Sequence, residues 1–379
     1  MKRFVAIASL LVLLSSISSA WGPVGHMLVA AVAWKQMKPS TRREISRIFR
    51  FGDEVAGNFG GQFDHIDYVK IDPETASDEE IEKRVGPAFI QAATWADDVK
   101  PDHNGNRAQH VAHESVPNPD FADLIKTLNG HLTASEPGEN SDLKAWHFVD
   151  YPLHFNRSRE VLIDTSSHHP IDKSGPKPTA HALNALRLEV QPNIKKLAPN
   201  STSDPHDTAV YVYLLEHIVG DLHQPLHCAT VYSTSFAPNP HDRGGNSFKL
   251  STSKSSLEGL AFVAKDNLHS LWDGGPNNAI LMDASLGITE PGKMSYDQIL
   301  HVADAWIQSS APSVAKANSL NPQSWAKDSE KLAVSSAYKG LKQHSKVTAT
   351  YAKRNVDLCR HQIVLGGFRL AKLLDSELN

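Results

Sequence analysis

A short segment in the middle of the chain constrains its fold more than any other: His217-Ile-Val-Gly-Asp221-Leu-His-Gln-Pro-Leu-His227. His217 and Asp221 are four residues apart, so a helix would project both side chains from one face. Pro225 ends that helix, because proline has no N–H to continue it, and the turn brings His227 back to the same region. A single His/Asp pair is usually a solvated or salt-linked surface pair, so the segment indicates a site only if other elements supply similar groups.

Four other places in the chain supply such groups. They are His269-Ser-Leu-Trp-Asp273, Ala145-Trp-His147-Phe-Val-Asp150, Thr94-Trp-Ala-Asp97 and Trp21-Gly-Pro-Val-Gly-His26. Imidazole and carboxylate without thiolate suit zinc and similar divalent ions, whereas calcium and magnesium prefer oxygen ligands alone. More ligands are available than the three or four that one zinc ion takes, so the pattern predicts a cluster of several ions.

The composition excludes some other classes of protein. The chain has 379 residues, with 38 Lys and Arg against 42 Asp and Glu and a formal charge of −4, which argues against a protein that coats duplex DNA by neutralising phosphates. Its 2 cysteines cannot form a disulfide framework or a cysteine-rich zinc module. The 20 histidines are the unusual feature, because histidine is the commonest metal ligand.

The first twenty residues have the pattern of a signal peptide. Lys2 and Arg3 precede a short apolar run, Phe4–Leu14, and small residues lead to Ala20. We expect cleavage after Ala20, which makes Trp21 the first residue of a secreted or periplasmic protein. The alternative, an uncleaved membrane anchor, is disfavoured because the apolar run is too short to span a bilayer with ease, and no later stretch is long and apolar enough.

The rest of the chain reads as one mainly α-helical domain, residues 21–379, with long loops at 100–120 and 156–178. The C-terminal helices within 294–379 carry no motif and are expected to be scaffold. Strand-like alternation is scarce, and Ser247–Leu250 and Leu260–Val263 are predicted to pair as one small β-hairpin. Helical periodicity covers Val24–Met37, Thr41–Phe51 capped by Ser40, Pro87–Val99, Phe121–Leu128, Thr179–Leu197 with a kink or a break at Pro192, Asp207–Leu222, Lys265–Trp272, Tyr296–Ser309, Gln323–Gly340 and Val347–Leu374.

Taken in order, these motifs resemble the S1/P1 nuclease family. The shared pattern is W-G-x-x-G-H at a processed N-terminus, then W-A-D, W-H-F-V-D, H-x-x-x-D-x-x-x-P-L-H, G-G-N and N-L-H-x-x-W-D, running from Trp21 to Asp273. The resemblance implies a helical bundle of the phospholipase C/P1 nuclease type. It also implies a secreted enzyme with three zinc ions that cleaves single-stranded DNA or RNA to 5′-nucleotides and removes 3′-phosphates from mononucleotides.

Carried over motif by motif, the resemblance implies three zinc sites that share Asp221. A metal-bridging hydroxide would attack phosphorus, because zinc lowers the pKa of bound water to about 7. The first site would use Asp97, His147, His217 and Asp221; the second His227, His269 and Asp273; and the third His26, Asp221 and the free amine and carbonyl of Trp21.

Four further residues are candidates for contact with the substrate. Lys100 matches a phosphate contact of the family but could equally be a solvated loop lysine. Asp150 could orient the attacking water or accept a hydrogen bond from a base. Phe148 could stack a base or pack in the core, and Asn246 in Gly244-Gly245-Asn246 could contact a base edge or simply form a turn.

The sequence also departs from familiar family members. Many of them carry disulfide cysteines soon after the H-F-[IV]-D element, whereas Asp150 here has no cysteine nearby. Cys228 and Cys359 can form at most one bridge. Cys228 adjoins His227, so it is either a zinc ligand or, as we expect, a small buried thiol.

Two other functions compete with a nuclease. A zinc-dependent phospholipase C shares the three-zinc arrangement, but the short spacing from Trp21 to His26, and Asp273 in place of a glutamate, favour the nuclease. A secreted zinc-binding protein without catalysis would not need Lys100, Phe148 or Asn246. We expect a monomer with single-stranded nucleic acid or a mononucleotide as substrate, and no stable protein partner.

Overall fold

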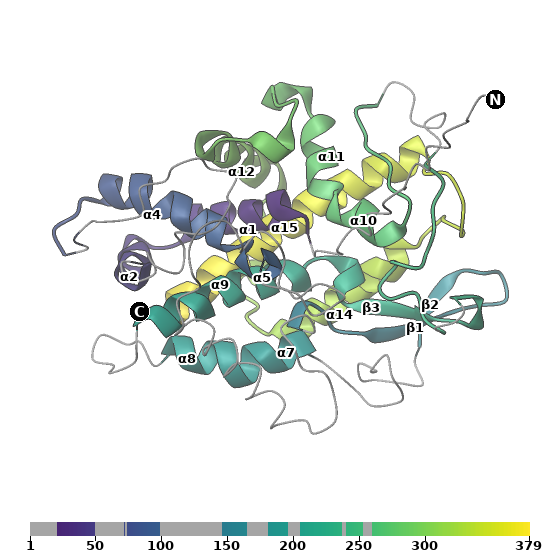
Figure 1. Cartoon of the computed structure of the whole chain (residues 1–379), viewed down its shortest axis with the longest axis horizontal. Coiled ribbons are helices and arrows are strands. Elements are labelled where there is room, and N and C mark those ends of the chain that lie inside the picture. The colour runs from purple at the N-terminus through teal and green to yellow at the C-terminus, as the bar shows by residue number, and fades with distance from the viewer. Residues whose placement is uncertain are drawn as a thin grey trace, which may run out of the picture.

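The computed structural model describes residues 21–49, 72, 74–98, 146–164, 181–195, 205–236, 240–252 and 260–379. In these residues helices predominate, and a small sheet lies at one side (Figure 1). The predicted mainly α fold is confirmed. The signal peptide, the helix expected at 121–128, the loop 100–120 and residues 165–178 lie outside the described residues.

The α-helices of the described residues are α1 (Pro23–Gln36), α2 (Pro39–Phe49), α4 (Asp78–Ala92), α5 (Trp95–Asp98), α7 (His181–Ala185), α8 (Gln191–Lys195), α9 (Pro205–Leu222), α10 (Leu268–Asp273), α11 (Gly275–Leu281), α12 (Tyr296–Ser310), α13 (Val314–Ala317), α14 (Pro322–Leu332) and α15 (Ala349–Glu377).

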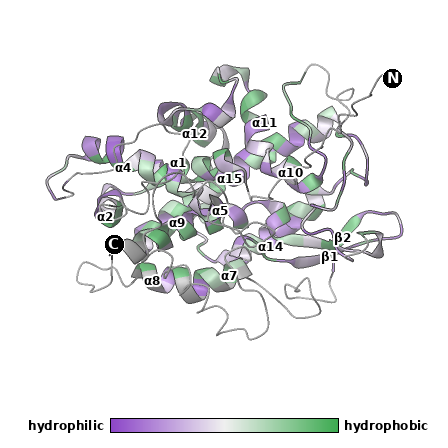
Figure 2. Cartoon of the chain, viewed as in Figure 1, coloured by the Kyte–Doolittle hydropathy of each residue, from purple (hydrophilic) through white to green (hydrophobic). Residues whose placement is uncertain are grey.

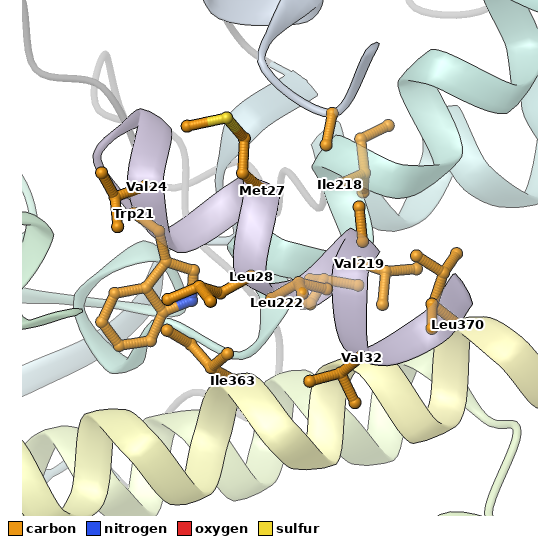
Figure 3. Close-up of a cluster of buried hydrophobic side chains, with 14 of the residues drawn as sticks. Trp21, Val24, Met27, Leu28, Val32, Ile218, Val219, Leu222, Ile363 and Leu370 are labelled. Carbon is orange, nitrogen blue, oxygen red and sulfur yellow. The ribbon is translucent and has the colours of Figure 1, made fainter. Parts of the chain in front are cut away.

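Helix α1 packs along α15 in the middle of the molecule (Figure 1). Every residue of α1 from Val24 to Trp34 is buried, as expected for a helix that is apolar on all sides. Figure 3 shows Leu28 and Val32 of α1 facing Ile363 and Leu370 of α15. This contact fixes the N-terminal helix, which carries His26, to the longest helix of the described chain.

The close approach of α1 and α15 depends on Gly367. A Cβ added at Gly367 would lie 2.5 Å from the Val32 Cβ and 2.8 Å from the Val29 carbonyl oxygen. We therefore expect Gly367→Ala to lower the free energy of unfolding by about 1–3 kcal/mol, because overpacking outweighs alanine's better helix propensity. Urea unfolding measures the change. Gly292→Ala is the matched control, since a Cβ there meets nothing within 4 Å; a Gly367→Ala protein as stable as this control would contradict the packing argument.

Helix α9 carries the central segment of the sequence into the core. Its residues from Ala209 to Leu222 are all buried, and it is largely hydrophobic, in contrast to the hydrophilic outer end of α4 (Figure 2). It contacts α1, α5, α8 and α15. Burying His217 and Asp221 in such surroundings is costly unless they are paired or bind a metal ion, so their position points to a site.

The strands lie elsewhere than predicted. In the described residues, β1 (Tyr151–Phe155) pairs antiparallel with β2 (Val161–Ile163) and parallel with β3 (Ala229–Tyr232), giving the order β2-β1-β3. A small hairpin exists, but it is β1–β2, and the prediction that 247–250 pairs with 260–263 is wrong.

Hydrogen bonds explain why these two segments do not pair. The Leu250 N–H donates to the Asp266 carbonyl rather than to a residue within 260–263. The Asn278 side chain satisfies both backbone groups of Val263: it accepts from the N–H (2.7 Å) and donates to the carbonyl (3.3 Å). With these groups already satisfied, Val263 needs no strand partner.

Several helix boundaries also differ from the predictions. Helix α4 begins nine residues before Pro87, because Ser77 and Glu80 form a capping box, and Pro87 lies inside the helix. Helix α2 begins at Pro39, so Ser40 is not its cap. The predicted helix around Pro192 is interrupted by a π-helical segment, Leu186–Val190, between α7 and α8. Among the described helices, none has the length and apolarity needed to cross a membrane.

Candidate metal centre

The end of α9 places three candidate ligands close together. His217 and Asp221 lie on its last two turns, and neither side chain is exposed to solvent. After Leu222 the chain turns through Gln224 into the 3-10 segment Pro225–His227. The Gln224 side-chain oxygen accepts from the Leu226 N–H (2.6 Å), which caps this segment and returns His227 toward the helix end. The predicted turn at Pro225 is confirmed.

A first group consists of Asp97 on α5, His147, His217 and Asp221. His147 Nδ1 lies 2.9 Å from His217 Nε2, 3.0 Å from Asp221 Oδ2 and 3.8 Å from Asp97 Oδ1. His217 Nε2 lies 3.4 Å from Asp221 Oδ2 and 3.5 Å from Asp97 Oδ1. Atoms bound tetrahedrally about 2.0–2.2 Å from a zinc ion are roughly 3.3–3.6 Å apart, and these five distances spread to both sides of that range. His147, His217 and Asp221 lie close enough together to hold one metal ion, and Asp97 adjoins them.

A second group consists of His227, His269 and Asp273. The Nε2 atoms of His227 and His269 are 3.2 Å apart, and Asp273 Oδ2 is 3.5 Å from His269 Nε2. Gln224 Nε2 donates to the other carboxylate oxygen of Asp273 (2.9 Å). The three ligand atoms lie close enough together to hold a metal ion.

His26, on α1, adjoins the first group. Its ring stacks on that of His217, with centroids 3.8 Å apart, and its Nε2 lies 3.3 Å from Asp221 Oδ1. Asp221 thus points Oδ2 at the first group and Oδ1 at His26, and Oδ1 is also 4.0 Å from His227 Nδ1. This position suits a carboxylate that bridges two ions. The described residues therefore bring the eight candidate ligand side chains into two neighbouring groups, with Asp221 and His227 at the point where the groups meet.

Trp21 is held beside the second group by its neighbour in the chain. The Gly22 N–H donates to the Asp273 carbonyl (3.0 Å), and the Trp21 side chain is fully buried among α1 and α15 residues (Figure 3). The indole therefore anchors the start of the described chain, so that the backbone at residues 21 and 22 lies next to a candidate ligand.

Backbone carbonyls orient three of the imidazoles. The Nδ1–H of His217 donates to the Ala93 carbonyl (2.8 Å). The Nδ1–H of His227 donates to the His147 carbonyl (2.5 Å), and that of His269 donates to the Gly244 carbonyl (2.6 Å). In the neutral imidazole this leaves Nε2 as an acceptor. The facing Nε2 atoms of His227 and His269 therefore present lone pair to lone pair, and the Nε2 of His217 faces carboxylates. Such contacts are favourable when a proton or a metal ion lies between the two atoms, and with a metal ion there they have the arrangement of metal-ligating histidines.

Neither cysteine belongs to these groups. Cys228 and Cys359 are both buried and free, so they do not form a bridge. The Cys228 thiol donates to the Leu222 carbonyl, and burial raises its pKa well above the usual value. A protonated thiol is a poor zinc ligand, so the prediction of a small buried thiol is supported.

The structure places three of the four candidate substrate residues. Asp150 is buried and accepts a hydrogen bond from the Thr230 hydroxyl, whereas Phe148 is half-buried. Asn246 is half-buried and donates to the Arg243 carbonyl (2.8 Å). The tight turn expected at the two glycines is confirmed, since both have positive φ, +59° at Gly244 and +86° at Gly245. Lys100 lies outside the described residues.

Sequence reasoning did not identify the groups that support the ligands. Gln224 holds Asp273, and the carbonyls of Ala93, His147 and Gly244 hold imidazoles. The one signal available was the polar Gln224 between two ligand residues, because backbone carbonyls have no signature in a sequence.

Asp242, close to Asp150, gives a pH-dependent stability. Burial raises its pKa from 3.8 to about 6, although the Tyr338 hydroxyl and the Val231 N–H both donate to it, and the nearby charge of Asp150 adds to the rise. Since the folded-state pKa is the higher, the carboxyl costs no stability below pH 3.8. Stability is lost as the pH rises from 3.8 to about 6, and above this the cost stays near 3 kcal/mol.

We therefore expect the free energy of unfolding of Asp242→Asn, relative to that of the wild type, to increase as the pH rises from 4 to 7. The increase should approach about 3 kcal/mol. Urea unfolding at several pH values measures this, with chelator present throughout so that zinc occupancy stays constant. A stability difference that is the same at pH 4 and pH 7 would show that the pKa of Asp242 is not raised by folding.

Comparison with known proteins agrees with this geometry. The family model described as S1/P1 Nuclease matches residues 21–379. "Endonuclease 1" of Arabidopsis thaliana is 30% identical over 172 residues, which cover 42% of this chain and 47% of that protein. "Endonuclease 2" of the same plant is 24% identical over 266 residues, which cover 66% of this chain and 82% of that protein. The chain thus spans about half the length of the first relative.

Proposed function

Because the chain belongs to the S1/P1 nuclease family, we propose that it is a secreted zinc-dependent phosphodiesterase that hydrolyses single-stranded DNA and RNA to 5′-nucleotides. We further propose 3′-nucleotidase activity, cleavage of a signal peptide after Ala20 and a monomeric state without a stable protein partner. Residues 21–379 would form one catalytic domain, with 294–379 as its scaffold.

The observation that carries this proposal is the clustering of candidate ligands around Asp221 and between His227 and His269. Asp221 directs one oxygen at His147 and the other at His26, and the Nε2 atoms of His227 and His269 face each other. His227 Nε2 and His269 Nε2 are 3.2 Å apart while each Nδ1–H is engaged by a carbonyl. A metal ion bound by both nitrogens would stabilise this buried contact, which supports a metal-dependent enzyme of this family. A set of mixed nitrogen and oxygen donors fits zinc better than calcium or magnesium.

We assign the ligands to three zinc ions. Asp97, His147, His217 and Asp221 would hold the first, and His227, His269 and Asp273 the second. His26, Asp221 and the amine and carbonyl of Trp21 would hold the third, as the family resemblance implies. Bound zinc supplies a water of lowered pKa and positive charge for the phosphate oxygens.

The protein's own residues would then position the substrate. Asp150 orients the attacking water or accepts from a base, and Lys100 contacts the phosphate. Phe148, which is half-buried, stacks a base, and Asn246 contacts its edge. Stacking on an aromatic ring tolerates every base, which suits cleavage with little sequence preference.

Product release from a substrate panel tests this proposal. Protein that begins at Trp21 is incubated with single-stranded DNA, RNA, a 3′-mononucleotide and phosphatidylcholine, with and without chelator. We expect release from the first three substrates that chelator abolishes and added zinc restores. Release from phosphatidylcholine alone would indicate a phospholipase C-like enzyme, and no chelator-sensitive release from any substrate would indicate a zinc-binding protein.

A further inference from the structure

The segment that follows His147 runs alongside the segment that follows His227. The Val149 N–H donates to the His227 carbonyl (2.7 Å), and β1 and β3 then pair in parallel with Pro152 opposite Thr230. This pairing brings Thr230 next to Asp150, so a residue outside every motif of the sequence adjoins a candidate catalytic carboxylate.

The hydroxyl of Thr230 makes two hydrogen bonds. It donates to Asp150 Oδ1 (2.5 Å) and accepts from the Gly244 N–H (3.1 Å), and the side chain is fully buried. A hydroxyl has one proton and two lone pairs, so a single threonine can serve both neighbours. Valine has nearly the same shape but could serve neither.

Gly244, which is hydrogen-bonded to Thr230, also contacts a candidate zinc ligand. Its carbonyl accepts from the His269 Nδ1–H (2.6 Å). It lies in the 243–246 turn, formed by Arg243, Gly244, Gly245 and Asn246, in which the first three residues all have positive φ. A Cβ at Gly244 would lie 2.4 Å from the Leu226 carbonyl oxygen, so the turn fits closely against the segment that leads to His227.

We propose that Thr230 is a positioning residue: its hydroxyl fixes the Asp150 carboxylate relative to the His269 imidazole through the backbone N–H and carbonyl of Gly244. The same bond sets the 243–246 turn, which carries Asn246, against β3. The role given to Asp150 rests on the function proposed above. The claim that Thr230 and Gly244 orient His269 rests only on the hydrogen bonds between them.

Thr230→Val and Thr230→Ser test the proposal. We expect Thr230→Val to lower kcat on single-stranded DNA by about 10–100-fold and to lose zinc at a roughly tenfold lower chelator concentration, as is usual when a group supporting a ligand is removed. Thr230→Ser keeps the hydroxyl and should stay within about threefold of the wild type in both measurements. Unchanged kcat and zinc retention in Thr230→Val, or a loss that serine does not restore, would overturn the proposal.

Thr41→Val is the matched control. The Thr41 hydroxyl is also fully buried and donates to a carboxylate, Asp375, at 2.5 Å, but it contacts none of the candidate ligands in the described residues. We expect this variant to lose stability while its kcat and zinc retention stay unchanged. Equal losses of kcat and zinc in Thr41→Val and Thr230→Val would mean that general destabilisation, not positioning, explains the effect.

Hydrogen exchange of the wild-type protein tests the same bond without a variant. The Gly244 amide lies in a turn, yet its bond to Thr230 predicts protection comparable to that of the β1–β3 amides; exchange as fast as in an exposed turn would contradict it. Zinc retention and amide exchange need no substrate. A wild-type protein that binds zinc but releases no product would therefore refute the proposed function and leave the support of His269 measurable.

Discussion

Asp221→Asn is expected to remove zinc from two of the three proposed sites at once and to lower turnover by about 100-fold or more, because loss even of a group that only supports a metal ligand typically costs about 10–100-fold. Asp221 is fully buried, with Oδ2 3.0 Å from His147 Nδ1 and Oδ1 3.3 Å from His26 Nε2. Asparagine has the same shape but no charge, and it presents an NH₂ group where one of the two oxygens faces a proposed metal site. Loss of a bridging carboxylate should therefore affect both sites that share it.

Zinc per chain, measured by plasma mass spectrometry beside kcat, tests this prediction. Asp304→Asn is the surface control, since Asp304 is half-exposed and pairs with Lys35, and it should change neither quantity. Lys100→Ala separates metal binding from substrate binding, because it should keep all the zinc and lower turnover. An Asp221→Asn protein that retains three zinc ions would show that Asp221 is not a shared ligand.

Residues left before Trp21 are expected to cost one zinc ion and most of the activity. A free α-amino group, with a pKa of about 7.7–8.0, can offer a lone pair to a metal ion at neutral pH. An amide nitrogen cannot, because its lone pair is delocalised over the peptide bond. The Gly22 N–H bond to the Asp273 carbonyl places this part of the backbone at the candidate centre. Cleavage of the signal peptide would thus complete the site.

Two preparations from one precursor test this second prediction. Protein that keeps a short extension before Trp21 is compared with the same protein after a protease has removed that extension. We expect zinc content and turnover to rise together on removal. Full activity and three zinc ions with the extension in place would contradict a role for the Trp21 amine.

A cluster of ions also explains how an acidic chain could bind nucleic acid. The formal charge is −4, so the surface as a whole does not attract phosphates. Zinc ions confined at the end of α9 would create a local positive field, and a local field rather than the net charge attracts a bound strand.

Local spacing in the sequence predicted that α9 presents His217 and Asp221 on one face, whereas the grouping of ligands from separate elements was implied by the resemblance to the S1/P1 nuclease family. His217 and Asp221 must share a face wherever α9 forms, and Pro225 must end it. The partners of those ligands depend on tertiary contacts between backbone groups, as with the His269 Nδ1–H and the Gly244 carbonyl. No residue type encodes such a contact, so these partners could not be predicted.

The strands were mislocated for a similar reason. Ser247–Leu250 and Leu260–Val263 alternate as strands do, but the Asn278 side chain already satisfies Val263. Tyr151–Phe155 contains a proline and was not predicted as a strand, yet it pairs on both sides, with β2 and β3. Pairing partners decide strand formation more than local pattern does.

Anomalous X-ray scattering at the zinc edge, from crystals of protein that begins at Trp21, tests the central claim most directly. We predict three peaks: one among Asp97, His147, His217 and Asp221, one among His227, His269 and Asp273, and one between His26 and the Trp21 amine. Crystals grown with zinc that show no peak among these residues would contradict the metal centre.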